Sequence, residues 1–527
     1  MNDTIDRGDL TPIDSGGCGL IRKTDPDAIR GYLGDASGMP GGAAEAVLLP
    51  QSAHEAAAAI AEAGARGIPI TISGGGTGLA GGRVPLGGWV LATDRLGGVR
   101  RVERTATGGI ATCGPAATLA DLDRAAAAAG LFLPPDPTET SAWIGGVVAT
   151  NASGGRSFHY GPMRRFVRRL ELVLPDGTRV DAPRGRFVAA AGGTLTLPSA
   201  GEERRVPAPQ AALARSKSAT GYAGGAGLDL VDLVVGSEGT LGLVTEAEIE
   251  LLPRPEGVLA GIVFFPSEAA CLAAVVDIRA RSYHERGYGG PAPSRPDPQG
   301  PPRGGASRSL LARALEFFGA DALEFVRRGG TTLPAGAQAA LLFEQEHEDG
   351  REEAIAALWA EALEAHGALL DDSWFALGVS ERQRIRDFRH ALPVAVNEWL
   401  ARHSRRKYGT DLSVPDDAFA EMFRTYRDDL RTSGLLSVTW GHVGDNHLHL
   451  NLLPRDDAEE EVAKVLFRRW VRKGAALGGA ISAEHGIGKL KTGLLAEAAD
   501  PDALAAMRAT KTALDPAGIL GRGNLFG

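Results

Sequence analysis

The sequence is poor in cysteine and has no excess of positive charge. Its 527 residues include three cysteines, Cys18, Cys113 and Cys271, which are far apart in the chain. The chain alone therefore cannot supply a disulfide framework or a four-cysteine iron–sulfur or zinc cluster. Asp and Glu number 65 against 56 Lys and Arg, a net charge of -9. This balance argues against nucleic acid as the main partner, because phosphate binding needs a basic face.

Long apolar runs are absent too. No run approaches the roughly 20 residues that span a bilayer, because charges such as Glu62 and Arg124 interrupt the alanine-rich stretches. Residues 1–14 are acidic and lack an apolar core, so we expect no secretory signal. We expect a cytoplasmic protein, with peripheral attachment at the inner membrane face as an alternative.

The composition is otherwise that of a globular chain, with 44% hydrophobic and 23% charged residues, and the length predicts two or three domains. Apolar segments around a helix capped by Ser52 predict a strand, a helix and a strand. We divide the chain into an extension (1–39), an α+β domain (40–254), a second domain (255–455) and a C-terminal helical segment (456–527). Residues 285–308, rich in Gly, Pro and Arg, are expected to form a mobile loop in the second domain.

The loop SGGGTGLAGG, residues 73–82, follows a strand and concentrates glycines whose backbone N–H groups can converge on an anion. Gly76, Gly78 and Gly81 satisfy GxGxxG, but a Rossmann fingerprint must open a helix, and Pro85 follows here. A phosphate cradle is the favoured interpretation and a flexible turn the alternative. Residues 134–167 and 236–245 contain a Pro-fixed turn and further glycines.

Residues 440–454, WGHVGDNHLHLNLLP, hold three of the 11 histidines. The turn signal at residues 444–446 predicts that His442 ends one strand and that the next strand begins at His447. Alternation places His447, His449 and Asn451 on one face, and the hairpin brings His442 close to His449. Clustered neutral imidazoles can bind a metal; structural histidines are the alternative. Glu484 and His485, between glycines in residues 478–491, suggest a third ligand.

These motifs together resemble the vanillyl-alcohol oxidase (PCMH-type) flavoprotein family, and specifically its D-2-hydroxyacid dehydrogenase branch, over most of residues 40–527. The resemblance implies an α+β fold. A PCMH-type FAD-binding domain of two α/β subdomains is joined to a cap domain, in which helices flank an antiparallel sheet, and the C-terminal helical segment returns to the FAD domain. It also implies these FAD contacts: Gly74, Gly75, Gly76, Thr77, Gly78, Pro135, Thr138, Gly145, Gly146, Asn151, Gly155, Glu238, Gly239, Val244 and Asn524. For Asn524, an ordinary helix stop is the alternative.

The resemblance further implies noncovalent FAD, because the glycine loop lacks the His or Cys that tethers flavin in some members. Cys113 is interpreted as a buried apolar residue. A divalent metal, with zinc favoured and manganese or iron as alternatives, would be held by His442, His449 and Glu484. His447 replaces an Asn of the commoner HxGDGNxH pattern. This leaves open whether His447 takes the place of one of the predicted metal ligands.

His485 would be the base that takes the substrate hydroxyl proton. Arg389 and Lys407 match the residues that bind the substrate carboxylate in this family, and Asn451 joins them in the predicted catalytic set; an exposed helix face and a solvated loop are the alternative for the two charges. Pro393 stands where dicarboxylate enzymes carry a small hydroxyl residue, which weakens the case for hydroxyglutarate.

The expected function is oxidation of a D-2-hydroxy acid to the 2-oxo acid, by hydride transfer to flavin N5. The electrons would pass to an external acceptor such as an electron-transfer flavoprotein or a quinone. A homodimer is a further hypothesis. The alternatives are a flavin oxidase of the same fold that acts on another alcohol, and a non-catalytic flavin- or metal-binding protein.

Overall fold

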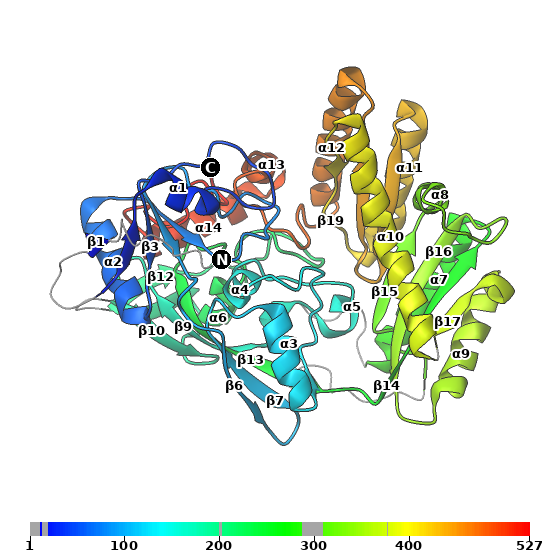
Figure 1. The fold of residues 1–527 in the computed structure, drawn as a ribbon, viewed down its shortest axis with the longest axis horizontal. Coiled ribbons are helices and arrows are strands. Elements are labelled where there is room, and N and C mark those ends of the chain that lie inside the picture. The colour runs from blue at the N-terminus through cyan, green and yellow to red at the C-terminus, as the bar shows by residue number, and fades with distance from the viewer. Residues whose placement is uncertain (1–10, 13–18, 200–202, 287–308, 377) are drawn as a thin grey trace, which may run out of the picture.

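The computed structural model describes residues 11–12, 19–199, 203–286, 309–376 and 378–527. Two sheets lie in the N-terminal half, and one large sheet forms the cap, on the right in Figure 1. The predicted α+β class is confirmed. The short helices are α1 (Pro26–Ile29) and five single turns of 3-10 helix: η1 (Arg30–Tyr32), η2 (Met163–Arg165), η3 (Leu370–Asp372), η4 (Asp416–Ala418) and η5 (Val443–Asp445).

The first sheet has the order β1-β2-β3-β5-β4, and β5 pairs in parallel with both β3 and β4. Helix α2 follows β3, and Ser52 caps it by accepting the Glu55 N–H at 3.2 Å. All residues of β3 and β5 are buried, as expected for parallel strands covered on both faces. The elements are β1 (Thr11–Pro12), β2 (Ile21–Lys23), β3 (Ala46–Leu49), α2 (Ala53–Arg66), β4 (Ile70–Ser73) and β5 (Trp89–Ala92).

The second sheet is antiparallel, with the order β10-β9-β13-β7-β6 and with β8 beside β13. Gly177, at a φ of 83°, lies in the turn between β9 and β10. The elements are β6 (Val99–Arg104), β7 (Gly109–Cys113), α3 (Leu119–Ala128), β8 (Leu131–Phe132), α4 (Ile144–Ala149), α5 (Ser157–Tyr160), β9 (Val167–Val173), β10 (Arg179–Pro183), the separate hairpin β11 (Thr194–Pro198) and β12 (Glu203–Pro207), α6 (Leu230–Val234) and β13 (Leu243–Pro253).

The cap sheet has the order β17-β14-β16-β15-β20-β21-β18, with β19 also beside β21. Residues of β14 alternate between two cores: Phe264 packs toward α8 and α10, and Phe265 toward α7 and α9. The strands are β14 (Gly257–Phe265), β15 (Ala314–Phe318), β16 (Ala339–His347), β17 (Trp374–Ala376), β18 (Tyr408–Gly409), β19 (Leu412–Ser413), β20 (Ser437–His442) and β21 (His447–Leu452). The helices are α7 (Glu268–Glu285), α8 (Ala320–Arg328), α9 (Glu352–Glu364), α10 (Val379–His403) and α11 (Phe419–Ser433).

The C-terminal segment divides at a different place from the predicted boundary. Helix α12 (Asp457–Ala476) packs on α11 in the cap, where the Trp470 indole donates to Asp429 at 2.8 Å. Only the following residues return to the first half, through α13 (Thr492–Ala498) and α14 (Pro501–Leu514), and α14 packs on β12. The buried face of α12 explains this difference, because a periodic apolar stripe in the sequence does not specify which domain covers it.

The structure also bears on the predicted loop at residues 285–308 and on the expected lack of a membrane span. The predicted mobile loop at 285–308 begins inside α7, which includes Glu285, and residues 287–308 lie outside the described part of the chain. Among the described residues, none of the helices combines the length and apolar character required to cross a bilayer.

Candidate active site

A cavity of about 340 Å³ opens between the glycine loop, α4 and the turn at residues 236–239. A Cβ added at Gly78 or Gly146 would meet no heavy atom within 4 Å, so these glycines leave open space beside the backbone. The cavity therefore fits a ligand that approaches the main chain closely. The predicted flavin contacts that line it are Gly74, Gly75, Gly76, Thr77, Gly78, Thr138, Gly145, Gly146, Glu238, Gly239 and Val244.

Two asparagines predicted to touch flavin are not among the lining residues, and both make hydrogen bonds within the protein. The Asn151 amide donates to the Ser218 carbonyl at 3.2 Å, and its oxygen accepts the Arg164 N–H at 3.0 Å. The Asn524 amide donates to the carbonyls of Gly82 and Glu238, both at 3.0 Å. These hydrogen bonds hold neighbouring loops together. A sequence motif does not show which partners a buried side chain of this kind will have.

Pro135 and Gly155 also lie outside the cavity lining. Pro135 is buried, and this segment first reaches the cavity at Pro137. Gly155 faces the cap, because a Cβ there would lie 2.7 Å from Glu316 Oε1 and 3.4 Å from His442 Nδ1. Gly155 therefore allows the two halves of the molecule to approach closely.

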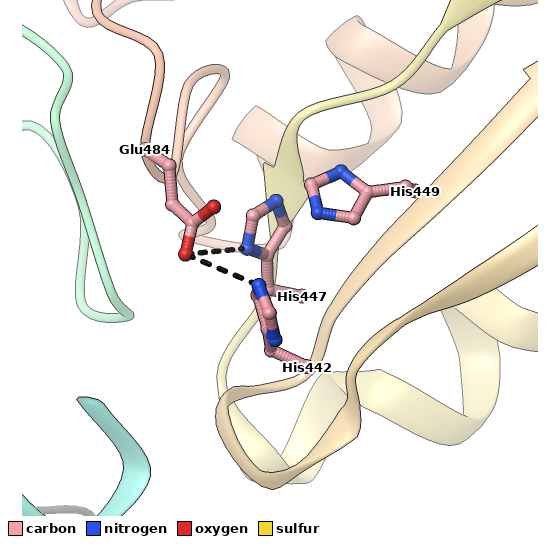
Figure 2. A group of neighbouring side chains, drawn as sticks. All are labelled: His442, His447, His449 and Glu484. Atoms are coloured by element: carbon pink, nitrogen blue, oxygen red, sulfur yellow. Dashed lines mark ion pairs between the residues drawn. The ribbon is translucent and has the colours of Figure 1, made fainter. Parts of the chain in front are cut away.

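The predicted histidine hairpin is present. Strands β20 and β21 pair His442 with His447 and Trp440 with His449, and Asn446 at the turn has a left-handed φ of 53°. Figure 2 shows His442, His447, His449 and Glu484 turned toward one another. One potential ligand atom from each lies within 4.8 Å of those of the other three. The structure thus brings together the predicted ligands and adds His447.

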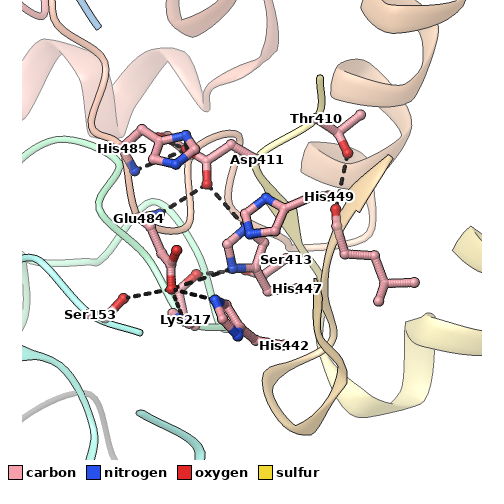
Figure 3. Close-up of polar contacts among 12 residues, drawn as sticks. Ser153, Lys217, Thr410, Asp411, Ser413, His442, His447, His449, Glu484 and His485 are labelled. Atoms are coloured by element: carbon pink, nitrogen blue, oxygen red, sulfur yellow. Dashed lines mark hydrogen bonds and ion pairs between the residues drawn. The ribbon is translucent and has the colours of Figure 1, made fainter. Parts of the chain in front are cut away.

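Three of these four side chains have a buried charged neighbour, and Figure 3 shows two of these neighbours, Asp411 and Lys217. His442 Nδ1 lies 3.2 Å from Glu316 Oε1. His447 Nε2 lies 3.1 Å from Asp411 Oδ1. The Glu484 carboxylate accepts a hydrogen bond from the Lys217 ammonium, whose side chain is 5% exposed. Such outer contacts orient ligands, and their loss weakens metal sites.

Charge and burial set the protonation of the group. Burial lowers the pKa of His447 and lowers that of His449 further, where the neighbouring imidazoles add to the effect. Burial opposes a charge on His442 as well, but Glu484 and Glu316 outweigh it and raise its pKa to about 9. Despite burial, Lys217 and His442 hold the pKa of Glu484 well below its usual value. The result is an anionic Glu484 carboxylate that favours a positive charge beside it, here the proton on His442, which a bound cation would replace.

The loop that carries Glu484 and His485 is held from both halves of the molecule. On the cap side, Asp411 accepts the backbone N–H groups of Glu484 and His485, each at 3.1 Å. On the other side, Glu238 accepts the N–H groups of Ile487 at 2.7 Å and of the next residue at 2.6 Å. Burial raises the pKa of Glu238 to about 7, against these hydrogen bonds.

His485 lies where the histidine group meets the flavin cavity. Its Nδ1 is 3.4 Å from Asp411 Oδ2, and its ring is nearly parallel to that of His449, with centroids 5.9 Å apart. Both Glu484 and His485 line the flavin cavity. A ligand in this cavity would therefore contact the predicted base and one predicted metal ligand.

The residues predicted to bind the substrate carboxylate are not among those that line the cavity. Arg389 on α10 makes two hydrogen bonds to Glu316, at 2.9 and 2.6 Å. Its guanidinium is therefore already paired with the carboxylate that lies beside His442 Nδ1. Lys407 is exposed and its ammonium lies 6.0 Å from the centre of the Trp440 ring. Asn451 is buried two residues after His449, and its amide donates to the His449 carbonyl at 3.3 Å. Their predicted roles in substrate binding stay predictions.

Three charged residues of the site are not among those predicted from the sequence. Glu316 is a charged residue in the otherwise apolar ALEFF strand, and a buried carboxylate of this kind is a usable signal of a partner. Asp411 lies four residues after Lys407, and no spacing in the sequence connects it with the histidines. Lys217 stands in a loop without periodicity, and its sequence context contains no such signal.

Comparison with known proteins identifies both halves. Residues 44–182 match a family model described as FAD binding domain, and residues 306–525 one described as FAD linked oxidases, C-terminal domain. The chain is 30% identical to a D-lactate dehydrogenase of Archaeoglobus fulgidus, over 91% of this chain and 90% of that protein. It is 29% identical to a D-2-hydroxyglutarate dehydrogenase of Xanthomonas citri pv. viticola, over 91% and 89%.

One further relative supports the same family, and one solved structure supports the fold. The chain is 28% identical to the glycolate oxidase subunit GlcD of Bacillus subtilis, over 92% of this chain and 89% of that protein. A solved structure of 4-ethylphenol oxidase from Gulosibacter chungangensis has the same fold, with a TM-score of 0.63 at 17% identity over 96% of this chain and 94% of that one. The chain therefore belongs to the FAD-linked oxidases, in the family that includes D-lactate dehydrogenase, D-2-hydroxyglutarate dehydrogenase and the glycolate oxidase subunit GlcD.

Proposed function

We propose that this protein oxidises a D-2-hydroxy acid to the 2-oxo acid with noncovalently bound FAD and a divalent metal. The observation that carries the proposal is the shared position of Glu484: it lines the flavin cavity and also belongs to the histidine group. A substrate in the cavity would therefore be within reach of the flavin, the metal and His485 together.

The residues present fit both groups. The cavity has the glycine-lined wall that a dinucleotide requires, and its lining includes neither a cysteine nor a histidine of the glycine loop, in keeping with noncovalent binding. A zinc ion with bonds of about 2.1 Å holds tetrahedral ligand atoms roughly 3.4 Å apart. The four potential ligand atoms all lie within 4.8 Å of one another, so small side-chain movements would bring them to that spacing. Imidazole and carboxylate donors favour zinc, with manganese or iron as alternatives.

The chain's own residues then have distinct tasks. FAD, when bound, supplies the hydride acceptor, and a divalent ion lowers the pKa of a coordinated hydroxyl. His442, His449 and Glu484 would hold the ion. Asp411, beside His485 Nδ1, orients the ring so that Nε2 can accept the hydroxyl proton. Arg389 and Lys407 supply positive charge for the substrate carboxylate.

Anaerobic flavin reduction tests this function. The purified protein is mixed with D-lactate, D-2-hydroxyglutarate or glycolate, with L-lactate as the matched control, and the flavin absorbance is followed. We expect at least one D acid or glycolate to bleach the flavin, and we expect chelator treatment to abolish bleaching until Zn²⁺, Mn²⁺ or Fe²⁺ is returned. Bleaching that does not require a metal would contradict the metal dependence.

The electrons are proposed to leave through an external acceptor. Among the described residues the two cysteines, Cys113 and Cys271, are both buried and free, so this part of the chain contains no cysteine cluster as a relay. Turnover with an artificial dye or a quinone should exceed turnover with oxygen alone. A faster reaction with oxygen would indicate an oxidase instead.

A further inference from the structure

His447 is a buried imidazole that the proposed chemistry does not use. Its side chain is 0% exposed, and neither ring nitrogen makes a hydrogen bond of good geometry among the described residues; Nε2 has the Asp411 carboxylate 3.1 Å away, whereas Nδ1 has no such neighbour within 3.5 Å. A buried polar atom without a partner costs free energy, so such an atom in a functional site points to a ligand. Nδ1 lies 3.8 Å from Glu484 Oε1, and the His447 ring centroid is 4.4 Å from that of His449. The atom therefore faces two predicted metal ligands.

The Asp411 carboxylate favours one tautomer of His447. Nε2 lies 3.1 Å from Asp411 Oδ1, so the carboxylate favours a proton on Nε2 and leaves the lone pair on Nδ1. Asp411 itself cannot turn away easily, because Lys491 donates to it at 2.8 Å and the backbone of Glu484 at 3.1 Å. A carboxylate behind an imidazole is the arrangement that prepares a metal-binding histidine.

We propose that His447 is a fourth protein ligand, so that three imidazoles and one carboxylate hold the metal. This rests on the metal dependence in the proposed function, and it extends the predicted set of His442, His449 and Glu484. His447 is 0% exposed and its neighbour His442 is 8% exposed, which leaves little room for the His447 ring to turn elsewhere.

A ligand set of three imidazoles and one carboxylate affects which ion binds and how a substrate oxygen can reach it. Three imidazoles select zinc, cobalt or iron over the oxygen-seeking magnesium and calcium. Four protein ligands complete a tetrahedral shell, so a substrate oxygen would have to enter as a fifth ligand. The site should therefore bind its metal tightly in the absence of substrate.

The direct test counts imidazoles in the parent protein. The protein is loaded with Zn²⁺ alone, without substrate, and X-ray absorption spectroscopy measures the number of imidazole nitrogens around the ion. We expect three. A count of two would overturn the proposal without the need for any variant.

A variant provides the second test. His447→Asn keeps a planar polar group beside Asp411 but removes the imidazole, and His54→Asn, at an exposed position on α2, is the matched control. Competition with a chromophoric chelator should show Zn²⁺ affinity reduced by more than the roughly 10- to 100-fold typical of a residue that only supports a ligand. The control should bind as the parent does, and an unchanged affinity in His447→Asn would refute the assignment.

These outcomes separate the ligand assignment from the proposed function. Three imidazoles on the metal without flavin reduction by any hydroxy acid would leave His447 a ligand and reject the activity. Metal-dependent flavin reduction with only two imidazoles would do the reverse. A parent protein that binds no Zn²⁺ would overturn the assignment, and flavin reduction would then be judged by itself.

Discussion

At the scale of single residues, the candidate site depends on charges placed behind the reacting groups. Glu316 lies behind His442, and Asp411 lies behind both His447 and His485. These carboxylates are buried, so each interaction is stronger than it would be in water. Loss of either carboxylate would therefore leave a buried imidazole without its charged partner.

His485→Asn should separate proton transfer from binding. Metal and FAD should stay bound, because the four clustered side chains and the glycine loop are unchanged. Flavin reduction in anaerobic stopped-flow should slow by roughly 10²- to 10⁴-fold, which is the usual contribution of a positioned base. Substrate affinity, obtained from the concentration dependence of the same traces, should change much less. Reduction at the parent rate would assign the base to another residue.

Glu238→Gln should change how stability depends on pH. The folded-state pKa of about 7 lies above the unfolded value, so the folded protein holds the proton more tightly, and stability falls as pH rises from about 4.5 through 7. Gln carries no titratable proton. Thermal unfolding of the flavin-free protein at pH 5 and pH 8 should show the parent losing roughly 2 kcal/mol relative to the variant. Parallel pH profiles would contradict the raised pKa.

At the scale of elements, the β20–β21 hairpin determines whether the histidines meet. Its turn requires Asn446 in the left-handed region, with the amide donating to Asp416 at 2.6 Å. Because side chains alternate along a strand, a slip of one residue in this hairpin would turn His447 and His449 away from Glu484. The turn is therefore part of the metal site.

Substitution of Asn446 by Ala and by Gly should distinguish backbone strain from side-chain contacts. Both variants lose the same amide contacts, but only Gly adopts the positive φ without strain. The Ala variant should be less stable than the Gly variant by about 1 kcal/mol and should bind Zn²⁺ more weakly. Thermal midpoints and chelator competition measure the two effects. Equal values in both variants would show that the turn tolerates the strain.

At the scale of the whole molecule, two halves meet around one cavity. The glycine loop comes from the first sheet's domain, the histidines from the cap, and the loop with Glu484 and His485 from the chain's return to the first half. Asp411 and Glu238 clamp that loop from opposite sides. FAD binding and metal binding should therefore be separable by substitutions in different halves.

Gly78→Val should fill the cavity and reduce FAD binding without unfolding the protein. A Cβ at this position meets no protein atom within 4 Å, so the side chain would occupy space reserved for the ligand. Gly98→Val, at an exposed glycine with equal room, is the matched control. Acid precipitation followed by absorbance should release flavin from the parent and control but little from Gly78→Val. Flavin that stays on the parent's pellet would contradict noncovalent binding.

The sequence alone determined the local features of this protein. The Ser52 cap and the histidine hairpin depend on neighbouring residues, so local residue patterns are sufficient to predict them. Tertiary structure alone decided which distant residues support the site. Lys217, Glu316 and Asp411 are separated along the chain from the side chains they contact, and α12 packs on the cap although its sequence fits either half. The physical reason is that burial and charge pairing between remote segments depend on how the domains pack, which local patterns do not encode.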